Sequence, residues 1–281
     1  IFFFCFVLFF LSIFRGYGMK KISNNKKILT AISCASLIVI LLVWWLYCDV
    51  FKLVPNAVFP GPDKVINTFI TKLYSKKPEG ATIFDHAFAS LKVCLLGYVL
   101  GAIVGIPLGI MMAWNKWVDR FARPLFDLIR PVPGLAWIPL FILLFGIGVA
   151  SKAMIIFLSA FVACTVNSYT GIRQTSLEHL WVGDVFGATD AQKLFRIAIP
   201  TATPMIFTGL RTALGTSWMA LVAAEMLAAS EGLGYMISQA RTIARCDIVI
   251  VGMLTIGLIG LLLDVILHAV EIRVAKGMNA K

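Results

Sequence analysis

Two charged side chains stand in the otherwise apolar stretch of residues 201–229, where they could act on a solute inside a membrane. Arg211 and Glu225 are fourteen positions apart, so an unbroken helix rising about 1.5 Å per residue separates them by roughly 21 Å. They cannot pair with each other on that helix. We expect Arg211 at the inner interface, where a long side chain reaches polar surroundings. An intramembrane carboxylate is a functional candidate, and Glu225 is either a gate or pathway group or the partner of another helix.

The residue patterns for hydrolysis and metal binding are missing from the sequence. No Gly-Lys dipeptide occurs, which excludes a phosphate-binding P-loop. His86, His179 and His268 are too scattered to suggest a metal site, and the six cysteines show no paired spacing. Asp264 and Glu271, the nearest candidates for reactive groups, are expected as interfacial charges. We therefore expect no catalytic residue, cofactor, metal or disulfide.

The elements that must position Arg211 and Glu225 are membrane helices. The chain has 281 residues, of which 60% are apolar and 14% charged, whereas soluble domains have roughly 25% charged residues. Apolar runs long enough to cross a bilayer, about 20 residues each, lie at 28–47, 93–114, 131–151, 153–172, 201–229 and 248–268. These runs predict an all-α, polytopic membrane helix bundle with six transmembrane helices.

Lysine and arginine are concentrated in alternate connections, which predicts a cytoplasmic N-terminus. The net charge of +11 then reflects topology and contact with anionic lipid, and no nucleic acid partner is expected. The longer outer segment, residues 48–85, has apolar residues on one helical face after Pro62 and Asp63. This pattern predicts an amphipathic helix on the outer surface.

The first 18 residues precede Met19 and a basic start, Met-Lys-Lys. We expect them to be a non-native leader or a gene-calling artefact, and a signal-like apolar region or a truncated extra helix is the alternative.

Two spans contain residues with a specific backbone role. Gly97, Gly101, Gly105 and Gly109 recur at intervals of four, which predicts a helix face that packs closely against another backbone. The run from Pro131 to Pro139 includes three prolines that free backbone carbonyls, typical either of a packing kink or of a transport site. Trp137, beside this break, is a candidate pathway residue.

A polar segment of about thirty residues, 173–200, separates two apolar spans and mixes charges with apolar residues at helical intervals. Gly187 can adopt the left-handed conformation that ends one short helix before another begins. Pro200 fits the first turn of the following span. A connection this long predicts a surface that binds a partner protein.

This segment resembles the cytoplasmic coupling loop of ABC importer permeases, whose motif is Glu-Ala-Ala, then Gly, then after nine residues Ile-x-Leu-Pro. Gly187 is followed nine residues later by Ile-Ala-Ile-Pro, residues 197–200, whereas Trp181-Val182-Gly183 replaces Glu-Ala-Ala. Over residues 54–270 the chain is similar to permeases of the nitrate, taurine, aliphatic sulfonate and bicarbonate importer group (binding-protein-dependent transport system inner membrane component).

The resemblance implies a type I ABC importer permease fold in a bacterial inner membrane, divided into 19–85 (first span and external helix), a core permease domain at 86–273 and a cytoplasmic tail at 274–281. It implies separate cytoplasmic ATPase subunits, an external solute-binding protein and a homodimer of this permease. The coupling-loop residues are then Trp181, Gly183, Gly187, Ala188, Asp190, Phe195, Ile197 and Pro200. The expected translocation path includes Trp137, Pro139, Glu225 and Met226.

The expected substrate is a small anion of the sulfonate, taurine or nitrate type. A thiamine precursor or another small solute is the alternative within the same family. A secondary transporter would also have interrupted helices, but more often with paired repeats, and no convincing repeat is found. A membrane-bound enzyme would need a reactive cluster, which is missing.

Overall fold

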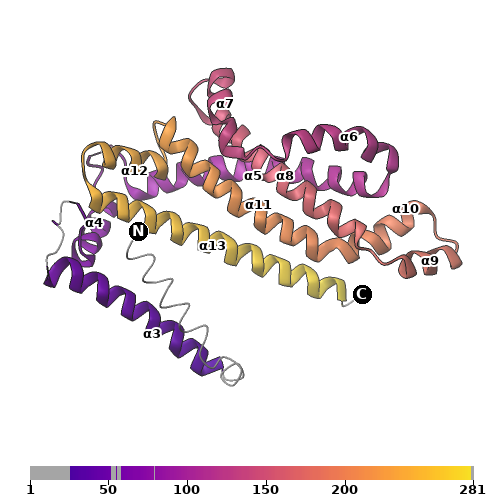
Figure 1. The fold of residues 1–281 in the computed structure, drawn as a ribbon, viewed down its shortest axis with the longest axis horizontal. Coiled ribbons are helices and arrows are strands. Elements are labelled where there is room, and N and C mark those ends of the chain that lie inside the picture. Colours follow the sequence, from indigo (N-terminus) through magenta and orange to yellow (C-terminus); the bar gives the residue numbers. More distant parts are fainter. Residues whose placement is uncertain (1–25, 52–54, 56–57, 79, 280–281) are drawn as a thin grey trace. The chain divides into compact units, whose positions relative to one another are not determined.

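The computed structural model describes residues 26–51, 55, 58–78 and 80–279, and this part of the chain is helical without a strand (Figure 1). The predicted leader, residues 1–18, lies outside the described residues. The chain divides into two compact units, residues 1–65 and 66–281. The first unit contains α3 (Lys26–Trp45) and a π-helical turn, η1 (Leu46–Val50). The helix α4 (Pro62–Tyr74) begins at the predicted Pro62 and crosses the boundary between the units.

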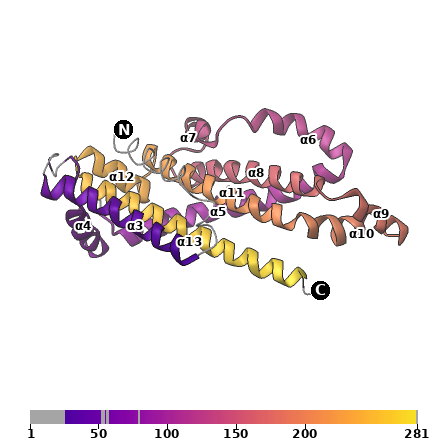
Figure 2. The same cartoon turned by 60° about the horizontal axis from the view of Figure 1, so that its bottom comes forward.

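The second unit holds the remaining helices. They are α5 (Ile83–Trp114), α6 (Lys116–Ile129), α7 (Ile138–Phe145), α8 (Val149–Arg173), α9 (Leu177–Val185), α10 (Asp190–Lys193), α11 (Ile199–Leu227), α12 (Leu233–Thr242) and α13 (Cys246–Asn279), with a 3₁₀ turn η2 (Gly134–Trp137) and a π-helical turn η3 (Leu194–Ala198). Within this unit α5, α8, α11 and α13 run side by side (Figures 1 and 2).

Among the described helices, α5, α8 and α13 are long and apolar enough to cross a membrane. A fourth crossing is obtained if α6 and the η2–α7 segment, which are bent by 79° at a short break, count as one span. The predicted first and fifth spans coincide with α3 and α11, which are helical, but α11 is not among the described helices that are long and apolar enough to cross. The count of six spans therefore remains a prediction.

The helix α5 begins at Ile83, ten residues before the apolar run predicted from the sequence. Thr82 and Asp85 form a capping box, in which the Asp85 carboxylate accepts from the Thr82 backbone N–H at 2.9 Å. The Thr82 hydroxyl accepts from the Asp85 backbone N–H at 3.3 Å. Since these bonds satisfy backbone donors that a helix start leaves open, the polar first turns of α5 are helical as well.

The centre of the second unit is formed by α8, which packs against α5 on one side and α11 on the other. The four glycines of α5 line the contact with α8. A Cβ atom at Gly97 would lie 2.6 Å from the carbonyl oxygen of Ala153, and one at Gly101 would lie 2.6 Å from Cβ of Ala160. The two backbones are therefore too close for larger side chains, which is how small residues allow helices to pack in lipid.

The segment between the second and third predicted spans is a helix and not an open connection. Asn115 caps α6 by accepting from the Trp117 backbone N–H at 2.8 Å. The side chains of Trp117, Phe121 and Leu128 form an exposed apolar stripe, each more than 75% exposed. This spacing was visible in the sequence, but the interspersed Arg120, Arg123 and Arg130 are also typical of a basic connection between spans.

Candidate functional site

The predicted coupling segment consists of two short helices, α9 and α10, joined by a tight turn at Gly187. Gly187 has φ of +71°, a conformation that favours glycine. Its N–H donates to the Asp184 carbonyl, and the Ala188 N–H donates to the Gly183 carbonyl, both at 2.9 Å. This pattern is a Schellman motif, so the turn is determined by local backbone geometry.

The helix α10 continues without a break into the long helix α11. Thr189 and Gln192 form a capping box at the start of α10, and η3 then leads directly into α11, with Pro200 in its first turn. A displacement of α10 therefore moves the N-terminal end of α11.

Lys193 joins α9 to α10 by ion pairs, and the small residue Gly183 allows the two helices to approach closely. Lys193 Nζ lies 2.6 Å from the Asp184 carboxylate and 2.9 Å from that of Asp190. Hydrogen bonds to Asp184 and then Asp190 raise the pKa of Lys193. Gly183 is buried, and a Cβ atom there would lie 3.1 Å from side-chain atoms of Lys193 and Ile197.

Large apolar side chains on this segment face away from the bundle. Trp181 is 63% exposed and Phe195 67% exposed. Val185 and Phe186, at the turn, are also exposed, and neither was singled out from the sequence. An exposed apolar surface bordered by the charged groups of Asp184, Asp190 and Lys193 is typical of a protein contact.

Glu225 is buried, with 1% of its surface exposed, and it holds the N-terminus of α12. Its carboxylate accepts from the Ser90 hydroxyl at 2.8 and 2.9 Å and from the Gly234 N–H at 3.0 Å. Ser90 in turn accepts from the Leu233 N–H at 2.9 Å, and His86 Nδ1 accepts from the Gly232 N–H at 3.2 Å. Of the two roles left open by the sequence, this geometry favours the partner of another helix.

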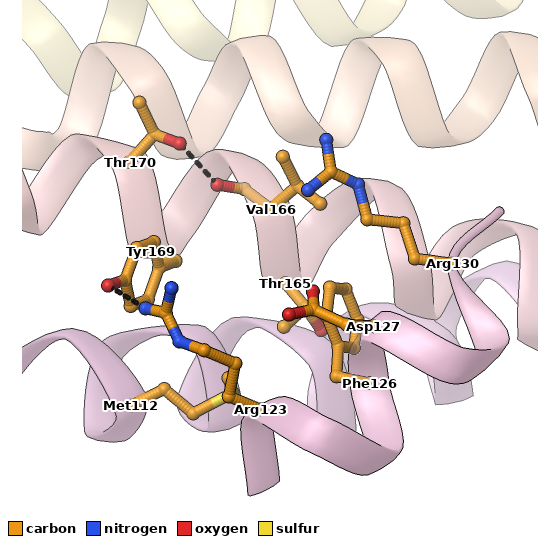
Figure 3. Close-up of a pocket in the computed structure, with 9 residues that line it drawn as sticks. All are labelled: Met112, Arg123, Phe126, Asp127, Arg130, Thr165, Val166, Tyr169 and Thr170. Atoms are coloured by element: carbon orange, nitrogen blue, oxygen red, sulfur yellow. Dashed lines mark hydrogen bonds between the residues drawn. The ribbon is translucent and has the colours of Figure 1, made fainter. Parts of the chain in front are cut away.

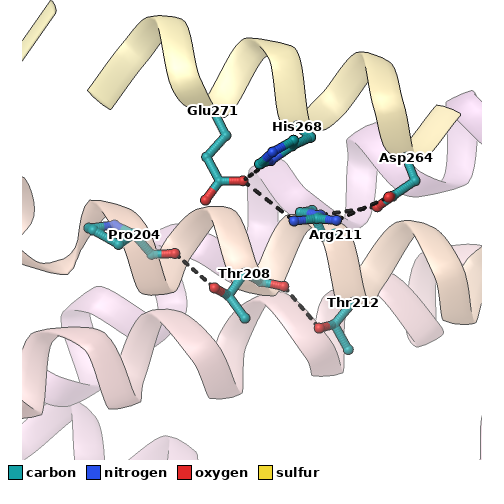
Figure 4. A network of polar contacts seen from close by, with 7 residues as sticks. All are labelled: Pro204, Thr208, Arg211, Thr212, Asp264, His268 and Glu271. Carbon is teal, nitrogen blue, oxygen red and sulfur yellow. Dashed lines mark hydrogen bonds and ion pairs between the residues drawn. The ribbon is translucent and has the colours of Figure 1, made fainter. Parts of the chain in front are cut away.

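Arg211 is paired with α13 (Figure 4). Its Nε and Nη2 atoms donate to the two carboxylate oxygens of Asp264, both at 3.0 Å. Nη1 lies 3.7 Å from Glu271, whose carboxylate also contacts His268 Nδ1 at 3.2 Å. The charges that the sequence placed separately at the interface therefore form one network between α11 and α13.

A stripe of hydroxyl groups on α11, missed in the sequence, adjoins Arg211. Thr208, Thr212 and Thr216 are exposed, and each hydroxyl donates to a backbone carbonyl one turn earlier at 2.9–3.0 Å. Their oxygens can still accept a hydrogen bond. The interval of four within an apolar span was the signal that could have identified this stripe.

The other predicted pathway residues lie on η2, α7 and α11. Trp137 stacks on Phe141, with ring centroids 6.0 Å apart, and packs against an apolar cluster from α7, α8 and α11. Pro139 is exposed and Met226 is half-buried. That Trp137, Pro139, Glu225 and Met226 line one translocation path stays a prediction. Among the described residues, no group of histidine, cysteine, aspartate and glutamate could hold a metal ion.

Comparison with known proteins identifies the family of this chain. Residues 105–276 match the model of the family described as binding-protein-dependent transport system inner membrane component. A putative ABC transporter permease protein of Methanocaldococcus jannaschii is 36% identical over 92% of this chain and 94% of its own length. The taurine transport system permease protein TauC of Escherichia coli is 35% identical over 86% and 88%, and the nitrate import permease protein NrtB of Synechocystis is 32% identical over 88% of both chains.

A solved structure has the same fold. A chain of the MetNI methionine ABC transporter, in an inward-facing conformation, aligns with a TM-score of 0.52 over 68% of this chain and 93% of its own. At 18% sequence identity this likeness concerns the fold alone.

Proposed function

The chain belongs to the binding-protein-dependent transport system inner membrane component family, and from this premise we propose that it forms the translocation path of an ATP-driven importer for a small anion. The expected resemblance to permeases of the nitrate and taurine group is confirmed, and so is the all-α membrane helix bundle. As a permease component, the chain would supply the path, with ATP hydrolysis on separate subunits.

The observation that carries the proposal is the continuity from the coupling segment into α11. The exposed apolar side chains of Trp181 and Phe195 would dock in a groove on a cytoplasmic ATPase. Because α10, η3 and α11 form one uninterrupted helical segment, movement of that ATPase would displace α11. The same helix has the hydroxyl stripe and Arg211, so ATP-driven movement would reach polar groups within the span.

The stripe of Thr208, Thr212 and Thr216 supports the position of the path. Polar side chains in a membrane span usually face the bundle interior or water, but these three are exposed in the single chain. A second permease copy would provide the opposite wall, and the path would lie between the two copies. Pro139 and Met226 remain candidates for its lining.

The complete importer would contain two ATPase subunits, two copies of this permease and an external solute-binding protein, in contact with membrane lipid. We place it in the bacterial inner membrane, as its family implies, and the lysine and arginine distribution supports a cytoplasmic N-terminus. The names of its relatives favour a sulfonate, taurine or nitrate type of solute. A thiamine precursor is the alternative solute.

Reconstitution with the partner ATPase into proteoliposomes tests this proposal. Uptake should require ATP and the external binding protein, and Gly187→Val should uncouple ATP hydrolysis from uptake because valine is strained at this positive φ. Gly187→Asn is the matched control, since asparagine tolerates the left-handed region. Normal uptake by Gly187→Val would refute the role of the turn, and uptake without ATP would indicate a secondary transporter.

A further inference from the structure

Lys152 is a buried cation in the first turn of α8, one of the helices that are long and apolar enough to cross a membrane. Only 5% of its surface is exposed, and it forms neither a hydrogen bond nor an ion pair with another described residue. The N-terminal end of a helix also disfavours a positive charge. Since charged side chains within a membrane usually have a partner or a function, Lys152 needs an acceptor that this arrangement of the helices does not give it.

The Glu225 carboxylate on α11 is an acidic group that attracts Lys152 electrostatically. The helices α8 and α11 pack together at this level, because Ile155, one turn after Lys152, shares an apolar cluster with Ala224, the neighbour of Glu225. The two charges attract each other but do not form an ion pair. A shift between α8 and α11 could therefore join them.

Glu225 already has partners, and they hold a different helix. Its carboxylate accepts from the Gly234 N–H at 3.0 Å and from the Ser90 hydroxyl at 2.8 Å, which fixes the first turn of α12 against α5. Two effects oppose this arrangement. Glu231, between α11 and α12, repels Glu225, and Glu225 lies in the last turn of α11, where the helix dipole disfavours a negative charge. The carboxylate therefore has two competing partners, the N-terminus of α12 and Lys152.

The helix α12 lies at the end of the second unit opposite the coupling segment (Figure 1). The helix α11 connects these two ends, because it continues from η3 and ends at Leu227, two residues after Glu225. A displacement that begins at the coupling segment therefore reaches Glu225 through one helix.

We propose that Lys152 is the alternative partner of Glu225, and that exchange between the two partners opens the end of the path opposite the coupling segment. In the closed arrangement, which the structure has, Glu225 holds α12. In the released arrangement the carboxylate leaves Gly234 and Ser90 for the Lys152 ammonium, and the first turn of α12 separates from α5. The inference rests on the proposed import function and deepens it by naming residues that open the path. Lys152 is a positioning residue, since it acts through Glu225.

Hydrogen exchange of the α12 amides, measured on the full-length chain in nanodiscs, tests this proposal. The N–H groups of Leu233 and Gly234 exchange when the first turn of α12 is released. Lys152→Met removes the partner of the released arrangement and keeps the hydrogen bonds of the closed one. Exchange should therefore slow by about tenfold, which corresponds to one charge-assisted contact. Lys152→Arg should exchange like the unsubstituted chain, and so should the matched control Lys92→Met, which removes an exposed lysine of α5.

The direction of the effect separates a switch from a purely structural role. If Lys152 only stabilised the fold, Lys152→Met would unfold at a lower temperature and its α12 amides would exchange faster. The proposal requires slower exchange and an unfolding temperature that does not fall, because methionine replaces an unpaired buried charge with an apolar side chain of similar length. Unchanged or faster exchange in Lys152→Met would overturn the proposal.

A double-mutant cycle assigns the effect to Glu225. Glu225→Gln keeps an acceptor for the Gly234 N–H but removes the charge that Lys152 attracts. In a chain with Glu225→Gln, the further substitution Lys152→Met should change the exchange rate by less than about twofold. Equal slowing by Lys152→Met with and without Glu225→Gln would show that Lys152 acts through another group, and the proposal would fail.

Uptake into proteoliposomes connects the switch to transport. Lys152→Met should lower ATP-dependent uptake by about tenfold, since the released arrangement becomes less populated, while the ATPase is still recovered with the permease. Normal uptake by Lys152→Met would contradict the role in opening the path. The exchange measurements need neither ATP nor the ATPase. An unsubstituted chain without ATP-dependent uptake therefore contradicts the proposed function, whereas unchanged exchange in Lys152→Met contradicts the switch alone.

Discussion

Arg211 on α11 and Asp264 on α13 form a bidentate ion pair, with both donor–acceptor distances at 3.0 Å (Figure 4). The pair joins the helix that continues from the coupling segment to the last long helix of the chain. A bidentate contact fixes the orientation of the arginine as well as its charge. Movement of α11 would therefore be transmitted to α13 at this point.

Asp264→Asn should lower the thermal stability of the purified chain, because Arg211 loses its bidentate partner and retains only Glu271 at 3.7 Å. The double reversal, Arg211→Asp with Asp264→Arg, should recover part of the loss if the ion pair itself is responsible. Thermal unfolding in detergent measures both effects. Equal stability of Asp264→Asn and the unsubstituted chain would mean that the pair does not contribute.

Glu225→Ala should destabilise the second unit more than Glu225→Gln does. Alanine leaves the Gly234 N–H and the Ser90 hydroxyl without their acceptor, and each unsatisfied buried group costs about 1–3 kcal/mol. Glutamine keeps one acceptor oxygen. Thermal unfolding, with limited proteolysis between α11 and α12, tests the difference, and a Glu225→Ala protein as stable as Glu225→Gln would show that the carboxylate does not hold α12.

Gly101→Val should separate α5 from α8. A Cβ atom at Gly101 would lie 2.6 Å from Ala160 Cβ and 2.7 Å from the Phe157 carbonyl, and overpacking of this kind typically costs about 1–3 kcal/mol. Gly257→Val on α13 is the matched control, because a Cβ atom there has nothing within 4 Å. The amount of folded protein in the membrane and its unfolding temperature should fall only for Gly101→Val.

Lys193→Met should loosen α9 from α10 and weaken recovery of the ATPase with the permease. Because its pKa is raised by Asp184 and then Asp190, Lys193 stabilises the folded segment fully below its unfolded pKa and loses this contribution only as pH rises through the higher folded value. The effect of Lys193→Met should therefore be constant near neutral pH and diminish in strong alkali. Arg196→Met is the control, and equal ATPase recovery from both variants would contradict the role of Lys193.

Much of the helical architecture and the coupling turn could be read from the sequence, because their determinants are local. The apolar runs predict the long helices, and the Thr189 capping box and the Gly187 turn involve residues within five positions of each other. The motif at residues 197–200, on which the prediction of a coupling loop depends, is local for the same reason. The apolar run begins ten residues after the start of α5. The polar first turns of this helix are stabilised by the Thr82 capping box, which hydropathy does not reveal.

Only the tertiary structure decided how the charged residues are used. Glu225 meets Ser90 across 135 positions, and Arg211 meets Asp264 across 53, so no local pattern relates them. Met112 of α5, Phe126 of α6 and Tyr169 of α8 likewise line one hollow, although they are distant in the chain (Figure 3). The sequence by itself determined where the long apolar helices and the Gly187 turn lie, since hydropathy and turn chemistry act within a few residues. Packing decided which buried and exposed polar groups meet, because those contacts depend on helices distant in the chain.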